Sequence, residues 1–275
     1  MTPLVRGTAV LAALLVCFGV AAQQQKFEPQ VGQAGKDVIW VPTPDDVVDR
    51  MLTMAQVTPN DFVVDLGSGD GKIAIHAARK FGARALGVEY NPDMVKLSQN
   101  NALAAGVAGK ASFRNADIFA TDFSQATVIT MYLLPGLNMK LRPQILSMRP
   151  GTRVVSHSFT MEDWEADEIS SVDGRRAYFW LVPANVMGSW TLETNGQRTD
   201  LTLEQTFQKI SGTVALGAVL GGLRDPKLRG ANISFAYVDA GGVRRDFSGR
   251  VSGNRMEGSL RDEKGQEGRW TATKK

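Results

Sequence analysis

The sequence predicts an α/β domain, with a parallel sheet covered by helices on both faces, followed by a small antiparallel β barrel or sandwich. Two patterns predict this fold. Apolar strand-like segments alternate with helical segments over residues 38–185, and short alternating segments separated by turn residues occupy 186–275. With 275 residues and 43% hydrophobic side chains, the chain is long enough for a full α/β domain and a smaller second one.

The first 22 residues are expected to be a signal peptide or a membrane anchor. Arg6 precedes an apolar run over 8–22 that is short for a membrane span and ends in small residues. We favour cleavage after Ala22 and export to the periplasm or the extracellular space, and a single-pass anchor is the alternative. Cleavage would remove Cys17, the only cysteine. Residues 23–37 are rich in Gln and Gly and are expected to be a linker.

A glycine-rich loop follows the first predicted strand and precedes a predicted helix over 72–81. This loop contains Asp65, Gly67, Ser68, Gly69 and Gly71. Glycines let the main chain turn tightly and approach a ligand closely. An acid at the position of Asp65 would repel a pyrophosphate but could help to anchor a cofactor that carries an ammonium. The loop therefore favours such a cofactor over a dinucleotide.

Two more acids end the next two predicted strands. The apolar run 85–88 leads into Glu89, which is placed to bind a ribose diol. The run 111–116 leads into Asp117 and Ile118, where the carboxylate could accept a hydrogen bond from an adenine amine. The ends of three successive strands therefore carry acids.

This order of motifs, D-x-G-x-G-x-G, then Glu, then Ala-Asp-Ile, resembles class I S-adenosylmethionine-dependent methyltransferases over about residues 40–182. The resemblance implies a Rossmann-like seven-stranded core with S-adenosylmethionine as cofactor. It assigns the methionine part of the cofactor to the loop 65–71, the ribose hydroxyls to Glu89, and the adenine to Asp117 and Ile118. An ordinary buried turn with solvated strand-end acids is the alternative, which three matches in order disfavour.

The remaining elements of this domain follow the same βα alternation. A helix over 44–55 is expected, with Thr43 as its N-cap and Asp46 at the capping-box position. Further helices are expected over 91–105 and 137–148, strands over 127–133 and 152–157, and a hairpin of 168–172 with 177–182.

Three segments, 40–44, 130–135 and 153–164, resemble a narrower group, the bacterial relatives of the mitochondrial ATP synthase c-subunit and adenine nucleotide translocase lysine methyltransferases. The resemblance implies a protein lysine as methyl acceptor. Segment 132–135 lacks the Asn or Asp before paired prolines that base methylases use, so no nucleic-acid substrate is expected. A small-molecule or lipid acceptor is one alternative, and an exported protein that binds S-adenosylmethionine without turnover is another.

Tyr132 and Thr43 are the first candidates for catalytic residues, because both are expected to line the acceptor channel. Trp164 or Glu162, on the loop after the fifth strand, are further candidates. Both aromatic candidates have a structural alternative: Tyr132 could be a core aromatic, and for Trp164 we favour a role in holding its loop against the hairpin.

The two histidines are expected to be structural. His76 lies in an Ala-rich helix, and a hydrogen bond is the favoured role for His157, although a role as base is the alternative. Two histidines and one cysteine do not make a usual zinc site, so no metal is expected.

The segment after residue 185 is expected to form about seven or eight antiparallel strands, separated by turns such as 195–196, 241–242 and 253–254. It carries 14 Lys and Arg against 10 Asp and Glu, whereas the rest of the chain carries 17 against 18. This basic surplus could favour association with an anionic membrane or envelope surface, or with an acidic partner. A domain that only covers one side of the first is the alternative.

Overall fold

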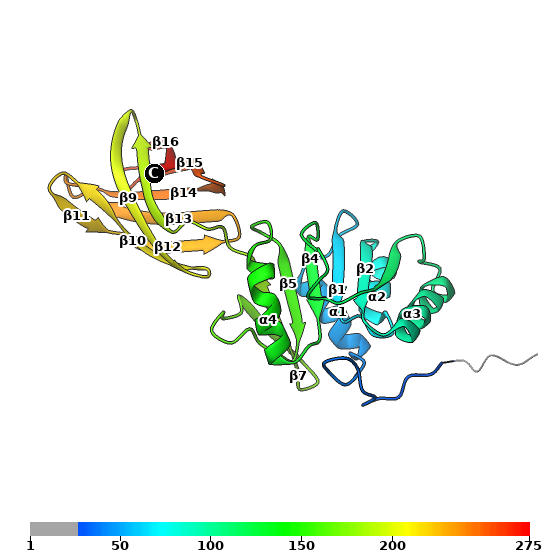
Figure 1. Cartoon of the computed structure of the whole chain (residues 1–275). Helices are drawn as coiled ribbons and strands as arrows, with labels where there is room; N and C mark the ends of the chain where they lie inside the picture. Colours follow the sequence, from blue (N-terminus) through cyan, green and yellow to red (C-terminus); the bar gives the residue numbers. More distant parts are fainter. Residues whose placement is uncertain (1–26) are drawn as a thin grey trace, which may run out of the picture.

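The computed structural model describes residues 27–275, which form two β-sheets (Figure 1). The predicted signal peptide or anchor, residues 1–22, lies outside the described residues and stays a prediction. Within 27–275, no helix is long and apolar enough to cross a membrane. The predicted domain boundary at 185/186 falls between the last strand of one sheet and the first strand of the other.

The first sheet has seven strands in the order β3-β2-β1-β4-β5-β7-β6. All neighbours are parallel except β7, which is antiparallel to both β5 and β6. This arrangement confirms the predicted α/β fold. The strands are β1 (Phe62–Leu66), β2 (Arg84–Glu89), β3 (Ala111–Asn115), β4 (Val128–Met131), β5 (Arg153–His157), β6 (Glu168–Val172) and β7 (Arg175–Leu181).

Helices cover both faces of this sheet because each one buries an apolar stripe against it. The helices are α1 (Asp45–Met54), α2 (Lys72–Phe81), α3 (Pro92–Ala104) and α4 (Pro135–Leu146). Buried residues of α1, α2 and α3 share one hydrophobic cluster. Those of α4 belong to a second cluster, together with Trp164 and Trp180.

The start of α1 differs from the prediction. Pro44 is the N-cap residue, and no side chain caps the helix. The Thr43 hydroxyl lies 3.2 Å from Nδ1 of His157 instead, so the predicted capping role of Thr43 is wrong. The start of α3 shows ordinary capping, because the Asn91 side chain accepts hydrogen bonds from the main-chain NH groups of Asp93 and Met94.

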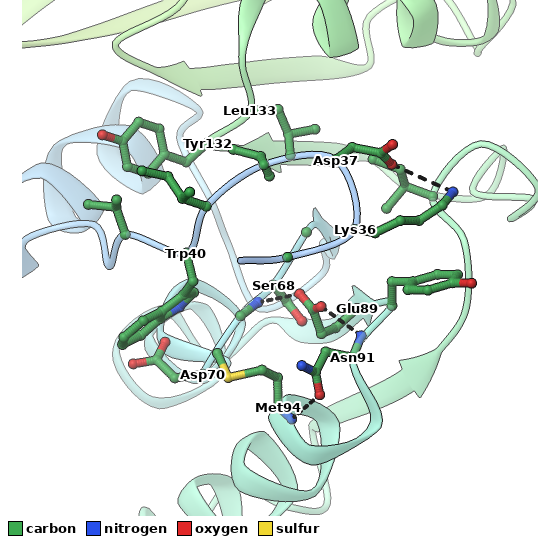
Figure 2. A pocket seen from close by; sticks show the side chains of 18 of the residues that line it. Lys36, Asp37, Trp40, Ser68, Asp70, Glu89, Asn91, Met94, Tyr132 and Leu133 are labelled. Atoms are coloured by element: carbon green, nitrogen blue, oxygen red, sulfur yellow. Dashed lines mark hydrogen bonds and ion pairs between the residues drawn. The ribbon is translucent and has the colours of Figure 1, made fainter. Parts of the chain in front are cut away.

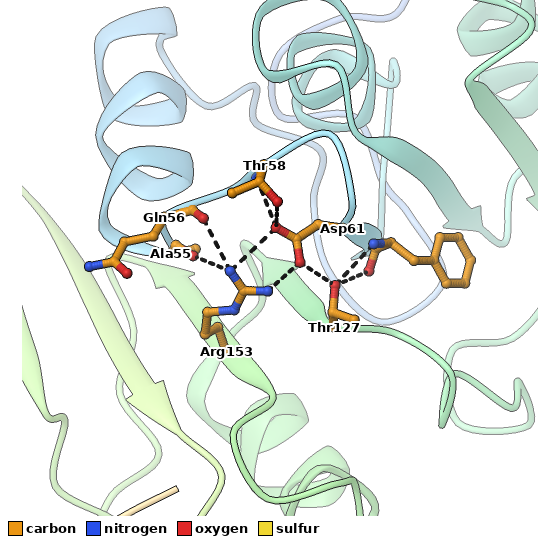
Figure 3. A network of polar contacts seen from close by, with 7 residues as sticks. Ala55, Gln56, Thr58, Asp61, Thr127 and Arg153 are labelled. Atoms are coloured by element: carbon orange, nitrogen blue, oxygen red, sulfur yellow. Dashed lines mark hydrogen bonds and ion pairs between the residues drawn. The ribbon is translucent and has the colours of Figure 1, made fainter.

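A buried ion pair joins β1, β4, β5 and the end of α1 at the amino-terminal edge of the sheet (Figure 3). Arg153 pairs with Asp61 and donates a hydrogen bond of 2.9 Å to the Ala55 carbonyl. Asp61 also accepts hydrogen bonds from the Thr58 NH at 2.8 Å and the Thr127 hydroxyl at 2.7 Å. Both carboxylate oxygens are therefore satisfied within the protein.

The second sheet has nine antiparallel strands that curl into a nearly closed barrel, with β11 and β12 at its two edges. Its interior contains Trp190, Phe235, Phe247 and Trp270. The strands are β8 (Gly188–Thr194), β9 (Gln197–Thr206), β10 (Lys209–Leu216), β11 (Val219–Gly222), β12 (Arg224–Arg229), β13 (Asn232–Val238), β14 (Arg244–Ser252), β15 (Arg255–Asp262) and β16 (Glu267–Lys274). The predicted class is confirmed, but the expected seven or eight strands are too few. The two unexpected strands, β11 and β12, contain glycines and a proline, which edge strands tolerate.

The hairpin between β9 and β10 joins the two sheets. The Phe207 ring stacks on Trp164 at a centroid distance of 5.9 Å, and the Arg142 guanidinium lies 5.2 Å from the same ring. Gln208 and Lys209 bond to the carbonyl and the carboxylate of Glu165 at 2.8 and 2.7 Å. The barrel is therefore fixed to the loop that follows β5.

Candidate functional site

A cavity of about 250 Å³ lies at the carboxyl ends of the parallel strands. It is bounded by the glycine loop after β1, by the ends of β2 and β4, and by residues 33–43 of the amino-terminal segment. Figure 2 shows the part of this segment that carries Lys36, Asp37 and Trp40 passing over Ser68 and Glu89. Residues 33–37 of the predicted linker are therefore part of the cavity wall.

The glycine loop has the conformation that its glycines allow. Gly67 and Gly69 have φ angles of 78° and 54°, a region that other residues rarely adopt. A Cβ atom at Gly69 would lie 2.6 Å from Nε1 of Trp40, so the two segments need glycine to approach this closely. The Ser98 hydroxyl supports the loop from behind with a hydrogen bond of 2.8 Å to the Gly69 carbonyl.

Two predicted loop residues contribute less to the cavity. Gly71 does not line it: a Cβ atom there would lie 2.7 Å from the Phe113 ring, so this glycine serves packing between the loop and β3. Ser68 lines the cavity, but its hydroxyl is buried against Gly87 and has no partner within the described residues.

Asp65 is buried at the end of β1 and accepts a hydrogen bond of 2.7 Å from the Thr130 hydroxyl. Burial raises the pKa of this carboxyl, the Thr130 hydrogen bond opposes the rise, and the charges of Asp70 and Glu89 add to it, so that the pKa is about 7. Burial also raises the pKa of Asp70. Three acids around one loop favour a ligand that carries a positive charge.

Glu89 is held in place by main-chain groups on both sides. Its Oε2 accepts a hydrogen bond of 3.0 Å from the Gly69 NH, and its Oε1 accepts one of 2.9 Å from the Asn91 NH. A carboxylate has about four acceptor positions, so each oxygen keeps one for a ligand hydroxyl. The side chain is thus oriented toward the cavity before any ligand binds.

Asp117 and Ile118 line the same cavity, at the end near Tyr90. Asp117 forms an ion pair of 2.6 Å with Lys36 and accepts a hydrogen bond of 2.9 Å from the Phe119 NH. The hydrogen bond with Lys36 lowers the pKa of the Asp117 carboxyl and raises the pKa of the Lys36 ammonium.

Tyr132 and Thr43 line the other end of the cavity, and both lie against His157. The Tyr132 ring lies 3.9 Å from the His157 ring and 6.0 Å from the stacked Phe159 ring, measured between centroids. His157 is buried, and burial, reinforced by the charge of Arg175, lowers its pKa to about 4. The imidazole is therefore neutral at physiological pH, and this end of the cavity is aromatic and carries no imidazolium charge.

The other candidates lie elsewhere. Trp164 is fully buried between Trp180 and Phe207, which agrees with the structural role that we favoured. Glu162 is exposed. Neither residue lines the cavity. His76 pairs with Asp49 between α1 and α2.

The cavity residues without a predicted role include Lys36, Trp40, Met94 and Phe159. Trp40 and Phe159 fall within the segments that carried the family resemblance, which was their only signal. Lys36 contacts Asp117 across 81 residues of sequence, and no local pattern indicates such a pairing.

The cavity fits the predicted S-adenosylmethionine. The end of the cavity that is formed by the glycine loop carries acids, which suit an ammonium group. Glu89 has free acceptor positions for hydroxyl groups. Tyr90 lines the cavity with Asp117 at the end assigned to the adenine, where a flat face suits a purine. The individual roles of these residues stay predictions.

Comparison with known proteins identifies a family. The ANTKMT methyltransferase domain matches residues 65–168. The chain is 44% identical over 138 residues to a protein-lysine N-methyltransferase of Saccharolobus islandicus (strain REY15A), a match that covers 50% of this chain and 86% of that protein. It is 30% identical over 132 residues to the human lysine N-methyltransferase of the ATP synthase c-subunit, covering 48% of this chain and 56% of the human protein.

One of the similar solved structures is also a methyltransferase. A protein described as an RNA methyltransferase from Salinibacter ruber, crystallised with S-adenosyl-L-homocysteine, is 50% identical, with a TM-score of 0.52, over 53% of this chain and 96% of that one. The family match, the curated relatives and the acid-lined cavity agree on one activity. The chain belongs to the ANTKMT methyltransferase family, and it is an S-adenosylmethionine-dependent methyltransferase.

Proposed function

We propose that the methyl acceptor is the side-chain amine of a protein lysine. The observation that carries this proposal is the aromatic end of the cavity, where Tyr132, Phe159 and Thr43 surround the space beyond the glycine loop. The Saccharolobus relative, which is named a protein-lysine N-methyltransferase, supports it.

The chemistry of a lysine acceptor suits this end of the cavity. Bound S-adenosylmethionine supplies an activated methyl group, so the protein has to bind the amine in its neutral form and align it. Aromatic faces attract the incoming ammonium, and an apolar environment lowers its pKa and favours loss of a proton. The neutral His157 adds no positive charge that would repel the lysine.

Thr43 and His157 would then act by positioning. The contact of 3.2 Å between the Thr43 hydroxyl and Nδ1 of His157 joins the entry to α1 with the end of β5. The Tyr132 ring packs on this pair through its contact with His157. We therefore assign Tyr132 to contact with the acceptor, and His157 to orientation of Tyr132 and Thr43.

An RNA acceptor is the second candidate, because the solved relative at 50% identity is described as an RNA methyltransferase. The sequence disfavours base methylation, since Tyr132 begins a Tyr-Leu-Leu-Pro segment in place of the Asn or Asp before paired prolines. A small-molecule or lipid acceptor is the third candidate.

One experiment separates these acceptors. The full chain is incubated with S-adenosylmethionine carrying a tritiated methyl group and with protein, RNA and lipid extracts of the producing organism. We expect label in the protein fraction, recovered as methyl-lysine after acid hydrolysis. Label in protease-resistant, ribonuclease-sensitive material would establish RNA as the acceptor, and label only in the organic extract would establish a lipid.

Tyr132→Ala should abolish methyl-lysine formation while leaving S-adenosylhomocysteine binding within about threefold, since Tyr132 lies beyond the acids that hold the cofactor. Lys96→Met is a suitable control, because Lys96 is exposed on α3 and does not line the cavity. Equal methyl-lysine formation by wild type and Tyr132→Ala would remove Tyr132 from the acceptor site.

A further inference from the structure

Residues 32–40 form a folded loop that covers the cavity, and we call this loop the roof. Its two ends are joined by hydrogen bonds of 2.9 Å from the Gly32 NH to the Trp40 carbonyl and from the Trp40 NH to the Gln33 carbonyl. A bond of 3.0 Å from the Gly35 NH to the Val38 carbonyl closes its tip. The roof is therefore a unit that can move as one piece.

The base of the roof is anchored beside the glycine loop. Trp40 packs on Gly69, where a Cβ atom would clash with the indole, and the Gln33 amide lies 3.7 Å from the Met94 sulfur. These contacts lie at the side of the cavity formed by the glycine loop and α3. They do not hold the tip.

Lys36 holds the tip at the opposite side of the cavity. Its ammonium lies 2.6 Å from Asp117, 4.9 Å from the centre of the Tyr90 ring and 5.9 Å from the centre of the Phe119 ring. Asp37, its neighbour in the roof, is 3.5 Å away. The ammonium thus lies near a carboxylate and two aromatic faces, of which Tyr90 lines the cavity at the predicted adenine position.

We infer that the roof is a lid over the cofactor site and that Lys36 is the positioning residue that closes it over the adenine end. Residues 33–40 of the roof line the cavity, so an outward movement of the roof would open the cavity to a ligand of the size of S-adenosylmethionine. Asp117 can hold Lys36 and an adenine amine together, because a carboxylate has about four acceptor positions and Phe119 and Lys36 use two. Closure and adenine binding are therefore compatible.

A surface ion pair alone contributes little to stability. Lys36 differs from an ordinary surface lysine in two ways: only 33% of its side chain is exposed, and its ammonium also lies near two ring faces. The ion pair between Lys36 and Asp117 joins the tip of the roof to the segment after β3. We therefore expect its loss to change the rate of ligand release and not the stability of the fold.

Lys36→Met tests this directly, because methionine keeps an unbranched side chain one atom shorter and removes the charge. Release of S-adenosylhomocysteine is measured by stopped-flow displacement on the full chain. We expect release to be about 5- to 20-fold faster, as the sum of an ion pair and a cation–π contact predicts, with an unchanged melting temperature of the ligand-free protein. Lys96→Met is the control for loss of a lysine, and Lys36→Arg should restore most of the slow release.

Two outcomes would overturn the inference. An unchanged release rate in Lys36→Met would show that Lys36 does not close the roof, and slower release with tighter binding would show that Lys36 competes with the ligand for Asp117. Hydrogen exchange at the Gly32 and Trp40 amides gives a second readout, since ligand should protect them in wild type more than in Lys36→Met. Neither measurement uses a methyl acceptor, so failure here is independent of the lysine acceptor proposed above.

Discussion

Asp65 and His157 are buried beside the same cavity, and burial shifts their pKa values in opposite directions. The pKa of Asp65 rises to about 7, and the pKa of His157 falls to about 4. Desolvation disfavours the charged form of each group, so it favours the neutral carboxylic acid of Asp65 and the neutral imidazole of His157. Near neutral pH, the ligand-free site therefore holds a partly protonated acid and an uncharged histidine.

Cofactor affinity should consequently depend on pH through Asp65. Because an ammonium binds the ionised carboxylate, the affinity for S-adenosylhomocysteine should fall as pH decreases below about 7, by roughly tenfold per pH unit at the steepest part. Titration calorimetry of wild type and Asp65→Asn at pH 6, 7 and 8 measures this. The variant should bind more weakly at pH 8 with a flatter profile, and an equal slope in both proteins would assign the titration to another group.

At the scale of the element, the two ends of β1 have different roles: one end stabilises the fold and the other borders the cavity. Asp61, the residue before β1, pairs with Arg153 at the start of β5, and Asp65 lies near the carboxyl end of β1. Burial alone would raise the pKa of the Asp61 carboxyl, but the hydrogen bonds from Arg153, Thr127 and Thr58 outweigh it and lower that pKa. A lowered carboxyl pKa stabilises the fold above the unfolded pKa of about 4, and this contribution is lost as pH falls through the folded pKa.

Asp61→Ala should therefore destabilise the protein without changing the cofactor site. Removing one partner of a buried pair leaves the Arg153 charge uncompensated, at a cost of about 3 kcal/mol. Urea unfolding near neutral pH measures the loss, and calorimetry with S-adenosylhomocysteine checks that the affinity is retained. A loss below about 0.5 kcal/mol would mean that water replaces the ion pair. Thr127→Val removes the hydrogen bond that the hydroxyl donates to Asp61 and the one that it accepts from the Phe62 NH, and it should cost about 2 kcal/mol.

Sequence predicts the elements of the first sheet well where local signals are strong. The helix α2 has the expected bounds 72–81, because Gly71 and Gly82 flank it in left-handed conformations. The helix α4 begins two residues before its predicted start, since Pro135 takes the first position. The roof carries no periodic pattern, and its pairing with Asp117 is long-range. Local sequence therefore predicts the acids of the site but not what covers them.

At the scale of the whole molecule, the barrel is attached to the methyltransferase sheet through Phe207. This residue has a φ of 54°, which is unfavourable for a bulky side chain, and its ring packs against Trp164 and Arg142. The match to the Saccharolobus relative covers 138 residues and 86% of that protein. Little of that protein's length is left for an equivalent of the barrel.

Phe207→Ala should weaken the contact between the two sheets. We expect thermal unfolding to separate into two transitions, because each sheet keeps its own hydrophobic core. Binding of S-adenosylhomocysteine should be unchanged. Leu220→Ser is the matched control, since Leu220 is 72% exposed on the next hairpin of the barrel. One transition in both variants, at the wild-type temperature, would show that other contacts hold the sheets together.

The assignment of the cofactor site depends most on Glu89, which main-chain NH groups of Gly69 and Asn91 orient into the cavity. Calorimetric titration of S-adenosylhomocysteine into the full chain, wild type and Glu89→Ala, tests it most directly. We predict saturable binding by wild type and a loss of about 1–3 kcal/mol in the variant, because the ribose hydroxyls lose a charged acceptor. Equal affinity of a folded Glu89→Ala protein would contradict the placement of the ribose and, with it, the proposed orientation of the cofactor.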